Sequence, residues 1–518
     1  MKNNSILWID DEIDLLKPHI LFLNDRGYEV VTSTNGSDAM RLVAQTDFDI
    51  ILLDEHMPGL SGLETLNRIK TLKPGIPVVM ITKSEEENLM EDAIGSKIAD
   101  YLIKPVNPKQ ILLSIKKNTE QKKLVSEKTS SNYQSEFMNI SSLINTARTY
   151  DDWVEVYQTL VYWELELEKL KDSGMFQILQ TQRLEANQNF TKFIRKTYAD
   201  WFNNKSSIKP PLMSHNVVKE KLIQHLAANE TVFFIVIDNL RLDQWKTIYP
   251  ILSDFFKIEK EELYCSILPT VTQYARNALF AGLMPLAIRT IYPNLWEGND
   301  EDEINNQYEE DLMRRQLSRL GYDIPMAYEK ISNQKNGRRV LDNITNYLNQ
   351  RLVVLVYNFV DMLSHARTEL ETVRELADDE AAYRTLTLSW FQHSYLFDLL
   401  KAASENKCKV IITTDHGSIR VNNPVKVIGD RDTTVNLRYK QGRNLNYNAK
   451  EVMEIKDPQS IQLPRFNLST TYIFAANDDF MAYPNNYNHY VSYYKNTFQH
   501  GGISLEEMLV PFVVLNPV

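Results

Sequence analysis

Carboxylates, imidazoles and one hydroxyl recur through the C-terminal part of the chain, in a set that could hold two divalent metal ions. The set comprises Asp238, Thr272, Asp361, His365, Asp415, His416 and His500. Mixed carboxylate and imidazole ligation suits Zn²⁺, with Mn²⁺ less favoured. A hydroxyl held against such metals can act as a nucleophile. Taken alone, each fragment is as typical of a helix cap, a turn or a surface pair, but their joint occurrence predicts a metal-dependent hydrolase of phosphoryl esters.

The carboxylates of this set lie where strands are expected to end. Asp361 and His365 are four positions apart, which places both on one face of a helix. Asp238 and the pair Asp415-His416 each follow a short apolar run, and ligand sites of open α/β sheets lie beyond the carboxyl ends of strands. The expected buried strands are Val232–Ile237, Leu352–Tyr357 and Val410–Thr414. These runs predict a second α/β domain around the metal ligands.

The hydroxyl and the last imidazole have weaker local signals. Thr272 lies just ahead of a helical stretch, Tyr274–Ala281, where it could simply cap the helix. Alternatively, a hydroxyl at a helix N-terminus is well placed to meet an anion. His500 precedes two glycines, which leave the imidazole free to project. Ser504 could then cap a helix with Glu507 as its capping-box partner.

The N-terminal part carries a second pocket of chemical groups. Its members are Asp10, Asp11, Asp54, Thr82 and Lys104. They fall at the ends of the expected strands Ser5–Ile9, Glu29–Ser33, Ile50–Asp54, Val78–Thr82 and Asp100–Ile103. Alternation of these strands with helices predicts a parallel, doubly wound sheet whose strand ends meet. Clustered carboxylates suit Mg²⁺, and Asp54 could accept a phosphoryl group that Thr82 and Lys104 then hold.

This pattern resembles that of response-regulator receiver domains over residues 1 to about 120. Met57-Pro58-Gly59 and the run Asp100–Pro105 strengthen the resemblance. It implies phosphorylation of Asp54, and Mg²⁺ bound by Asp10, Asp11, Asp54 and the backbone carbonyl of His56. It also implies that Thr82 and Tyr101 are a switch pair, which reports phosphorylation to the face built by the fourth helix, fifth strand and fifth helix.

The order of the C-terminal motifs resembles that of the alkaline phosphatase superfamily, most closely its PglZ branch, over residues 210–518. The resemblance implies one metal held by Asp238, Asp415, His416 and the nucleophile Thr272. It implies a second metal held by Asp361, His365 and His500. Thr270, in Pro269-Thr270-Val271-Thr272, is the second choice of nucleophile. The implied mechanism is in-line displacement in two steps through a phosphothreonine.

Four residues are candidates for substrate contact: Arg241, Arg276, Arg438 and Tyr439. No counterpart of the arginine that clamps monoesters in alkaline phosphatases is identified, although Arg241 and Arg276 are nearby, and this favours diesters. Arg438 and Tyr439 belong to a basic stretch, Arg420–Arg443, that could guide a nucleotide, with Tyr439 stacking on a base. A solvated charged loop is the commoner explanation of such a stretch.

Bulk properties bound the remaining possibilities. The net charge of −11 argues against a sequence-independent duplex binder, and two cysteines exclude a disulfide framework. We expect no transmembrane segment or signal peptide, and a cytoplasmic location. The expected domains are a receiver at 1–120, a helical linker at 121–205 with the boundary at Ser206–Pro211, and a PglZ domain at 206–518.

The whole arrangement resembles the PorX type of response regulator. The resemblance implies a sensor histidine kinase as partner, control of type IX secretion, and a homodimer that forms on phosphorylation. With two Zn²⁺ in the PglZ domain and Mg²⁺ in the receiver, the leading hypothesis is a phosphodiesterase that cleaves small linear or cyclic oligonucleotides. The alternative is a non-catalytic platform, with structural metals, that binds a sigma factor or a secretion-system protein.

Overall fold

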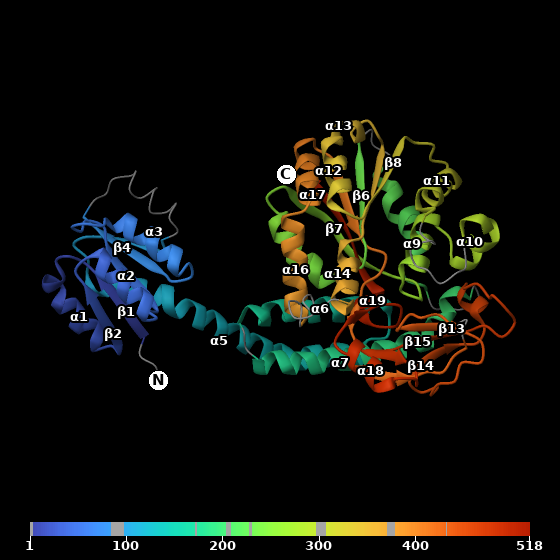
Figure 1. The fold of residues 1–518 in the computed structure, drawn as a ribbon, viewed down its shortest axis with the longest axis horizontal. Coiled ribbons are helices and arrows are strands. Elements are labelled where there is room, and N and C mark those ends of the chain that lie inside the picture. Colours follow the sequence, from blue (N-terminus) through green and yellow to red (C-terminus); the bar gives the residue numbers. More distant parts are fainter. Residues whose placement is uncertain are drawn as a thin grey trace. The chain divides into compact units, whose positions relative to one another are not determined.

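The computed structural model describes residues 4–83, 98–170, 173–203, 209–226, 230–296, 307–369, 379–430 and 433–518 (Figure 1). The chain forms two compact units, Met1–Gln134 and Ser135–Val518. Among the described residues, none of the helices combines the length and the apolar character that a membrane span requires. Each unit is described by itself below.

The first unit is a doubly wound α/β domain. Its strands are β1 (Asn4–Ile9), β2 (Tyr28–Ser33), β3 (Ile50–Asp54), β4 (Val78–Thr82) and β5 (Asp100–Ile103). They pair in parallel in the order β2-β1-β3-β4-β5, which confirms the expected sheet. The helices are α1 (Lys17–Asn24), α2 (Gly36–Gln45), α3 (Gly62–Leu72) and α5 (Pro108–Thr146). The expected fourth helix falls in residues 84–97, outside the described residues.

Both faces of this sheet are buried, because apolar side chains cover both. β3 and β4 are buried along their whole length. Leu53 and Leu66 belong to one apolar cluster, whereas Leu52 and Ile111 belong to another. Since successive side chains of a strand point to opposite faces, Leu52 and Leu53 place these clusters on opposite sides. Such double burial is why these strands are continuous apolar runs in the sequence.

The second unit is built on a mixed sheet with the strand order β7-β18-β10-β6-β9-β8. The bounds are β6 (Val232–Ile237), β7 (Phe256–Cys265), β8 (Met326–Ile331), β9 (Leu352–Tyr357), β10 (Lys409–Thr413) and β18 (Leu509–Pro517). β10, β6, β9 and β8 run parallel, and β18 pairs antiparallel with β10 and β7. The expected strands are thus confirmed, with β10 displaced by one residue.

Helices cover this sheet on both sides. The helices named here are α8 (Leu242–Ile248), α9 (Thr272–Ala281), α10 (Pro285–Ile291), α11 (Glu309–Arg319), α12 (Gln334–Asp342), α13 (Ile344–Tyr347), α14 (Phe359–Glu369), α16 (Glu380–Gln392) and α17 (Tyr395–Glu405). In Figure 1, α12, α16 and α17 lie on one side of the sheet, and α9, α10 and α11 lie on the other.

Small sheets between β10 and β18 form a separate layer of the second unit. Their strands are β11 (Ile419–Arg420), β12 (Asn423–Lys426), β13 (Tyr439–Gly442), β14 (Val452–Ile455), β15 (Thr471–Ala475), β16 (Asp479–Ala482) and β17 (Phe498–Gln499). β13, β14 and β15 form one sheet, β12 pairs with β16, and β11 pairs with β17. The helices α18 (Tyr487–Tyr494) and α19 (Leu505–Met508) flank β17. His500 follows β17 of this layer, and the chain then continues through α19 into β18 of the main sheet.

Two long helices of the expected linker, α6 (Tyr150–Leu170) and α7 (Ser173–Thr197), pack against each other. Their contact includes Trp153 and Phe190, whose ring centroids are 5.6 Å apart. The helical character expected for residues 121–205 is confirmed, whereas Ser206–Ile208 of the predicted boundary lie outside the described residues. Both helices belong to the same compact unit as the C-terminal sheet.

Buried ion pairs join these helices to the rest of the second unit. On α7, the Arg183 guanidinium lies 3.0 Å from Glu164 Oε2 of α6 and 2.6 Å from Glu506 Oε1 of α19. On α16, Arg384 Nη1 lies 2.7 Å from Glu164 Oε1 and 2.8 Å from Asp243 Oδ2 of α8. Because each buried charge has a partner of opposite sign, the helices and the sheet depend on each other for charge balance.

Candidate functional site

Three neighbouring parallel strands deliver the predicted carboxylates to one edge of the main sheet. Asp238 directly follows β6, Asp415 lies two residues after β10, and Asp361 lies in the first turn of α14, which follows β9. Because β10, β6 and β9 are adjacent and parallel, their carboxyl ends meet. The residues that the sequence spreads over almost two hundred positions are therefore brought together.

The first group consists of Asp238, Asp415 and His416, which are all buried and whose potential ligand atoms lie within 4.8 Å of one another. His416 Nε2 is 3.8 Å from Asp238 Oδ1 and 3.7 Å from Asp415 Oδ2. The other ring nitrogen, Nδ1, lies 3.1 Å from the carbonyl oxygen of Gly417. This contact orients the ring and leaves Nε2 for a ligand, as is usual for metal-binding histidines.

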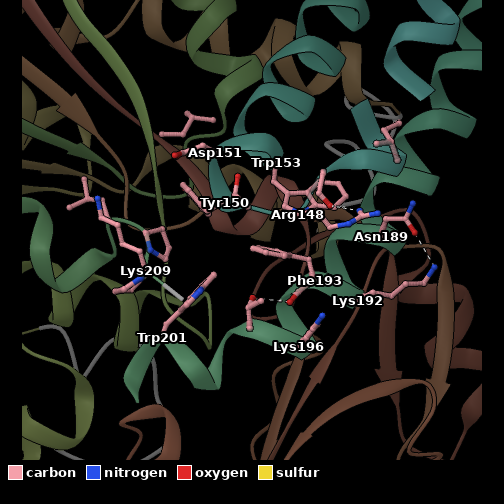
Figure 2. Close-up of a pocket in the computed structure, with 18 of the residues that line it drawn as sticks. Arg148, Tyr150, Asp151, Trp153, Asn189, Lys192, Phe193, Lys196, Trp201 and Lys209 are labelled. Atoms are coloured by element: carbon pink, nitrogen blue, oxygen red, sulfur yellow. Dashed lines mark hydrogen bonds between the residues drawn. The ribbon is translucent and has the colours of Figure 1, made fainter. Parts of the chain in front are cut away.

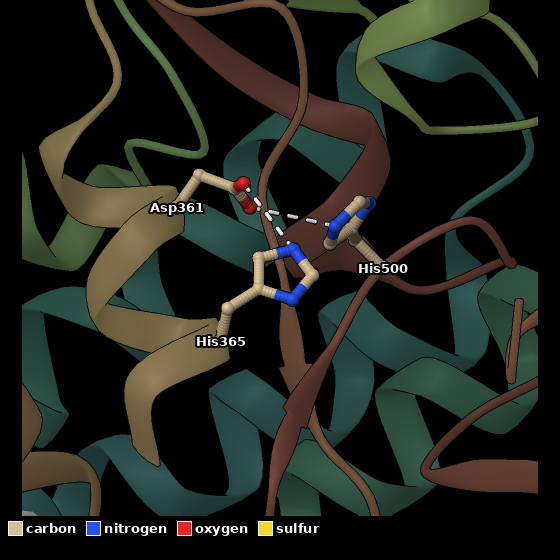
Figure 3. A group of neighbouring side chains, drawn as sticks. All are labelled: Asp361, His365 and His500. Carbon is tan, nitrogen blue, oxygen red and sulfur yellow. Dashed lines mark ion pairs between the residues drawn. The ribbon is translucent and has the colours of Figure 1, made fainter. Parts of the chain in front are cut away.

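The second group consists of Asp361, His365 and His500 (Figure 3). His365 Nε2 lies 3.3 Å from Asp361 Oδ2, and His500 Nε2 lies 3.5 Å from Asp361 Oδ1. Asp361 and His365 do share one face of α14, as their spacing predicts. His500 Nδ1 lies 3.2 Å from the carbonyl oxygen of Thr270, so its Nε2 faces the carboxylate. His365 is exposed, which leaves this group open to solvent on one side.

Asn239 joins the two groups and was not among the predicted site residues. Its side-chain amide donates to Asp361 Oδ1 at 3.2 Å, and its backbone N–H lies 3.4 Å from Asp415 Oδ1. Its φ is +63°, a left-handed conformation that asparagine tolerates better than most residues. The sequence feature that could have identified Asn239 is its position directly after a buried strand and Asp238. The imidazoles of His416 and His500 also stack, with ring centroids 4.3 Å apart.

Electrostatics keep most of these ligands ready to bind cations. Burial raises the pKa of Asp361, but hydrogen bonding and charge from His365, with charge from His500, outweigh it and hold the pKa well below its usual range. Burial, together with His416, lowers the pKa of His500 to about 3, so this imidazole is neutral near pH 7. Burial instead raises the pKa of Asp238, since Arg276 offsets only part of the cost.

Arg276 is a positioning residue for the carboxylates, which corrects the expectation that it contacts substrate. Its guanidinium is fully buried on α9 and forms ion pairs with Asp238, with Asp415 at 3.0 Å and with Glu309 at 3.3 Å. Arg276 is also the main cause that lowers the pKa of Asp415 against the effect of burial. The Arg276 guanidinium therefore pairs with carboxylates of the protein. Glu309 is, after Asn239, the second site residue that was not predicted from the sequence.

The hydroxyl of Thr272 lies beside the first group. Thr272 Oγ1 is 3.1 Å from His416 Nε2 and 3.3 Å from Asp238 Oδ1, and the side chain is partly exposed. Thr272 is the first residue of α9, while the N-cap is Val271, so its hydroxyl is not used as a cap. Thr270, the second choice of nucleophile, is fully buried and hydrogen-bonds Gly502 O and Gly501 N. The geometry favours Thr272.

Arg241 and Arg438 do not contact a substrate site, contrary to expectation. Arg241 is fully buried and forms ion pairs with Asp243 and Glu380. Arg438 is fully buried and forms an ion pair with Glu507 at 2.6 Å. Each guanidinium has the carboxylate partners that a buried charge requires, so neither is left to bind a phosphate.

The basic stretch Arg420–Arg443 is divided, because Arg438 and Lys440 are buried whereas Lys426 and Arg443 are exposed. Lys440 is 1% exposed and donates to the carbonyls of Thr434 and Val435. Tyr439 is 4% exposed, so its ring does not offer an open face to a base. A side chain at Gly501 would meet this ring, which places Tyr439 against the loop of His500 as a packing residue. Arg431 lies outside the described residues.

The loop after His500 is held by the expected cap at Ser504. The Ser504 hydroxyl accepts from Glu507 N, as predicted. The Glu507 carboxylate, however, accepts from Gly502 N at 2.8 Å and from the Ser504 hydroxyl at 2.7 Å, besides pairing with Arg438. Glu507 therefore fixes the glycine loop that presents His500, and does not complete a capping box.

In the first unit, Asp10, Asp11 and Asp54 offer ligand oxygens within 4.8 Å of one another. Lys104 Nζ lies 2.8 Å from Asp10 and 2.9 Å from Asp54. Burial raises the pKa of Asp54, while Lys104 opposes this change.

The switch pair Thr82 and Tyr101 and the His56 carbonyl stay predictions. The hydroxyls of Thr82 and Tyr101 are hydrogen-bonded. His56, whose backbone carbonyl is the further Mg²⁺ ligand expected, lies two residues after Asp54 with an exposed side chain.

The donor sets fit divalent cations in both units. The receiver cluster offers oxygens alone and is partly exposed, which suits a hard cation that keeps water ligands. The C-terminal groups combine carboxylates with imidazoles, and those of His416 and His500 are oriented through their second nitrogen, which suits a transition metal. Their excess of buried negative charge is a further reason for cations to bind there.

Comparison with known families agrees with this architecture. Residues 217–515 match the BREX system PglZ alkaline phosphatase-like domain, residues 123–202 the PorX response regulator linker domain, and residues 6–116 the response regulator receiver domain. The PglZ match covers more than half of the chain, which therefore belongs to the PglZ family. The order of receiver, linker and PglZ domain is that of a PorX-type response regulator. The domain boundaries at 120 and 205 stay predictions.

Individual proteins are similar to the receiver part of this chain. The chain is 35% identical over 111 residues to the transcriptional regulatory protein ZraR of Klebsiella oxytoca, covering 21% of this chain and 25% of that protein. It is 30% identical over 112 residues to ResD of Bacillus subtilis, covering 22% and 46%. The chain thus spans less than half the length of these relatives.

Solved receiver structures also resemble this part of the chain. The receiver domain protein of Methanospirillum hungatei is 26% identical, with a TM-score of 0.23, over 23% of this chain and 96% of that one. TrrA of Thermotoga maritima in complex with Mg(2+)-BeF is 27% identical, with a TM-score of 0.21, over 22% and 97%.

Proposed function

We propose that this response regulator carries a zinc-dependent phosphodiesterase as its output domain, with Thr272 as the nucleophile. The observation that carries the proposal is the partly exposed Thr272 hydroxyl, 3.1 Å from His416 Nε2 and 3.3 Å from Asp238 Oδ1. A structural scaffold has no need of a hydroxyl between metal ligands at a solvent-accessible helix end. Its substrates would be small linear or cyclic oligonucleotides, as the family resemblance implies.

The proposed reaction has two steps. The Thr272 oxygen attacks phosphorus, the bond to the leaving oxygen breaks, and a phosphothreonine forms; water then hydrolyses it and restores the hydroxyl. Asp238, Asp415 and His416 would hold one Zn²⁺, and Asp361, His365 and His500 the other. When bound, such ions lower the pKa of a hydroxyl and stabilise the leaving oxygen. The N-terminus of α9 favours the phosphate anion at the same place.

The arginines of the second unit support a diester rather than a monoester substrate. A phosphodiester carries one negative charge. A monoester carries up to two, and Arg241, Arg276 and Arg438 are all engaged by protein carboxylates.

The receiver supports a regulatory role for the same chain. We propose that a sensor histidine kinase phosphorylates Asp54 with Mg²⁺ held by Asp10, Asp11, Asp54 and the His56 carbonyl. Lys104, already 2.9 Å from Asp54, would pair with the new phosphoryl oxygens, and Thr82 and Tyr101 would respond. The PorX-type order of domains supports homodimerisation on phosphorylation, a cytoplasmic location and a role in type IX secretion.

The test is hydrolysis of bis(p-nitrophenyl) phosphate by the full-length, zinc-loaded protein. We expect metal-dependent turnover that is lost in Thr272→Ala and partly kept in Thr272→Ser. Thr290→Ala is the matched control and should keep turnover, because Thr290 is an exposed threonine outside the metal-ligand set.

Metal content of every variant is measured alongside turnover. No turnover with both metals bound, or full turnover in Thr272→Ala, would contradict the proposal. The first result would instead favour a non-catalytic platform that binds a sigma factor or a secretion-system protein.

A further inference from the structure

A cavity of about 970 Å³ lies in the second unit, away from the metal ligands (Figure 2). It is bordered by the end of α5, the start of α6, the end of α7 and the segment from Lys209 to Leu212. None of the residues that line it belongs to the metal-ligand set. Its volume is at the upper end of the range for small-molecule sites.

Aromatic side chains form the body of this cavity. Trp153, Phe193 and Trp201 all line it, and Figure 2 shows them around its centre. The ring centroids of Trp153 and Phe193 are 6.2 Å apart, and those of Phe193 and Trp201 are 6.1 Å apart. Trp153 and Trp201 are 1% and 7% exposed and back this aromatic wall, whereas Phe193 is partly exposed and is the ring that is open to a ligand. Such a wall favours a flat ring that can stack on it.

Positive charge surrounds the aromatic wall. The cationic residues are Arg148, Lys192, Lys196 and Lys209, and Figure 2 shows Lys209 on one side with Arg148 and Lys192 on the other. A further lysine, Lys221, is neutralised by Glu262 at 2.7 Å.

These four cations keep their charge available. Arg148 donates to backbone carbonyls and Lys192 to the neutral amide of Asn189. Among the described residues, neither Lys196 nor Lys209 has a carboxylate in ion-pair contact, and Asp151 is the other acidic residue lining the cavity besides Glu262. The cavity thus has an excess of positive charge, which attracts phosphate groups.

We propose that this cavity binds a nucleotide, with the base against Phe193 and the phosphates near the lysines. A purely apolar ligand would leave the cations unused. Inorganic phosphate would not use the exposed aromatic ring. A phosphorylated heteroaromatic ring uses both features. This site is separate from the metal centre and does not rest on the proposed phosphodiesterase.

The experiment is calorimetric titration of the full-length protein with ADP in EDTA, so that the metal centre holds no divalent cation. We expect ADP to bind, and to bind more tightly than adenosine or pyrophosphate. Lys192→Glu/Lys196→Glu should weaken ADP binding at least about tenfold, which corresponds to about 1.4 kcal/mol. Both lysines are exposed, so the change leaves the fold intact. Lys257→Glu/Lys335→Glu, with the same charge change at exposed residues that do not line the cavity, should bind as the unchanged protein does.

A second measurement locates the ligand directly. Photolabelling with 8-azido-ADP should modify peptides that contain Trp153, Phe193 or Trp201. Absence of ADP binding, equal affinity for pyrophosphate, an unchanged affinity in the Lys192/Lys196 variant, or labelling at the metal centre would each overturn the proposal.

Discussion

The two acidic clusters of this molecule lie at equivalent places in their sheets but differ in burial and in ligand type. Asp10, Asp11 and Asp54 offer only oxygens, and Asp11 is exposed. Asp238 and Asp415 are buried and share their site with a histidine. An open cluster of oxygens suits a cation that must exchange water and phosphate ligands. A buried cluster of oxygens and nitrogens suits a cation that stays bound. The difference in burial therefore suits the first cluster to a reversible switch and the second to a lasting metal site.

The cationic residues that pair with the two clusters also differ in burial. Lys104 pairs with Asp10 and Asp54 through one flexible ammonium group whose side chain remains 14% exposed. Arg276 is fully buried and binds Asp238, Asp415 and Glu309 through its planar guanidinium. Lysine is a movable point charge, whereas arginine fixes the geometry of its partners. Lys104 can therefore follow a new phosphoryl group, and Arg276 holds ligands in place.

The largest expected effect comes from emptying one of the two C-terminal groups. Asp361→Asn/His365→Ala should remove one of two zinc equivalents and lower phosphodiesterase turnover by a factor on the order of 10³ or more. A bound metal contributes several kcal/mol to the transition state, and about 1.4 kcal/mol is tenfold in rate. Metal analysis and steady-state kinetics measure both. Asp10→Asn/Asp11→Asn is the matched change in the open cluster and should leave the zinc content unchanged.

The next effect compares the two balancing cations. Arg276→Met removes the guanidinium that pairs with the buried Asp238 and Asp415, while Glu309 keeps Lys330 at 3.4 Å. The change should destabilise the metal-free second unit by about 3–5 kcal/mol. Lys104→Met should cost its own unit clearly less, since water reaches that cluster. Urea denaturation in EDTA measures both. Adding zinc should recover part of the Arg276→Met loss, and equal losses in the two variants would contradict the contrast drawn here.

A smaller effect is expected at the residue that bridges the two metal groups. Asn239→Gly keeps the left-handed backbone but removes the amide that donates to Asp361, so zinc affinity should fall about 10–100-fold. Competition with a chromogenic chelator measures it. Asn406→Gly, at an exposed helix end, is the matched control and should leave zinc affinity unchanged. An unaltered affinity in Asn239→Gly would show that the bridge does not support the metals.

The smallest effect is a pH dependence of stability. His500 has a pKa of about 3 when folded and about 6.5 when unfolded, so the unfolded chain binds the extra proton between these values. Stability should therefore fall as pH decreases, by about 1.4 kcal/mol from His500 between pH 7.5 and 5.5. Urea denaturation in EDTA at both pH values measures it, and His500→Gln should flatten the slope. The buried His215, with a pKa of about 4, also lowers stability as pH decreases. Its contribution is the same in the unchanged protein and in His500→Gln, so it cancels when the two slopes are compared.

The strands and the clustering of the carboxylates and histidines could be predicted because their signals are local. Val232–Ile237 and Leu352–Tyr357 are continuous apolar runs since parallel strands are buried on both faces, and each ends near its carboxylate. The four-residue spacing of Asp361 and His365 is a property of any helix. Such features do not depend on the rest of the fold.

The roles of the arginines could not be predicted, because their partners are distant in the sequence. Arg241 meets Glu380 from 139 positions away, and Arg438 meets Glu507 from 69 positions away. A basic residue near a motif is equally consistent with a substrate contact and with a buried ion pair. Asn239 was missed for the same reason, since its contact with Asp361 spans 122 positions. Only the folded arrangement decides between such alternatives.

The ion pairs between the linker helices and the C-terminal part determine where this protein can be divided. A chimera that joins a foreign receiver after residue 205 would discard Glu164 and Arg183, and would leave Arg384 and Glu506 buried with fewer partners. A junction near residue 134, where the compact units divide, would retain all four. The exchangeable module is therefore the receiver alone, and recombination that creates new sensors for this output must preserve its long helices.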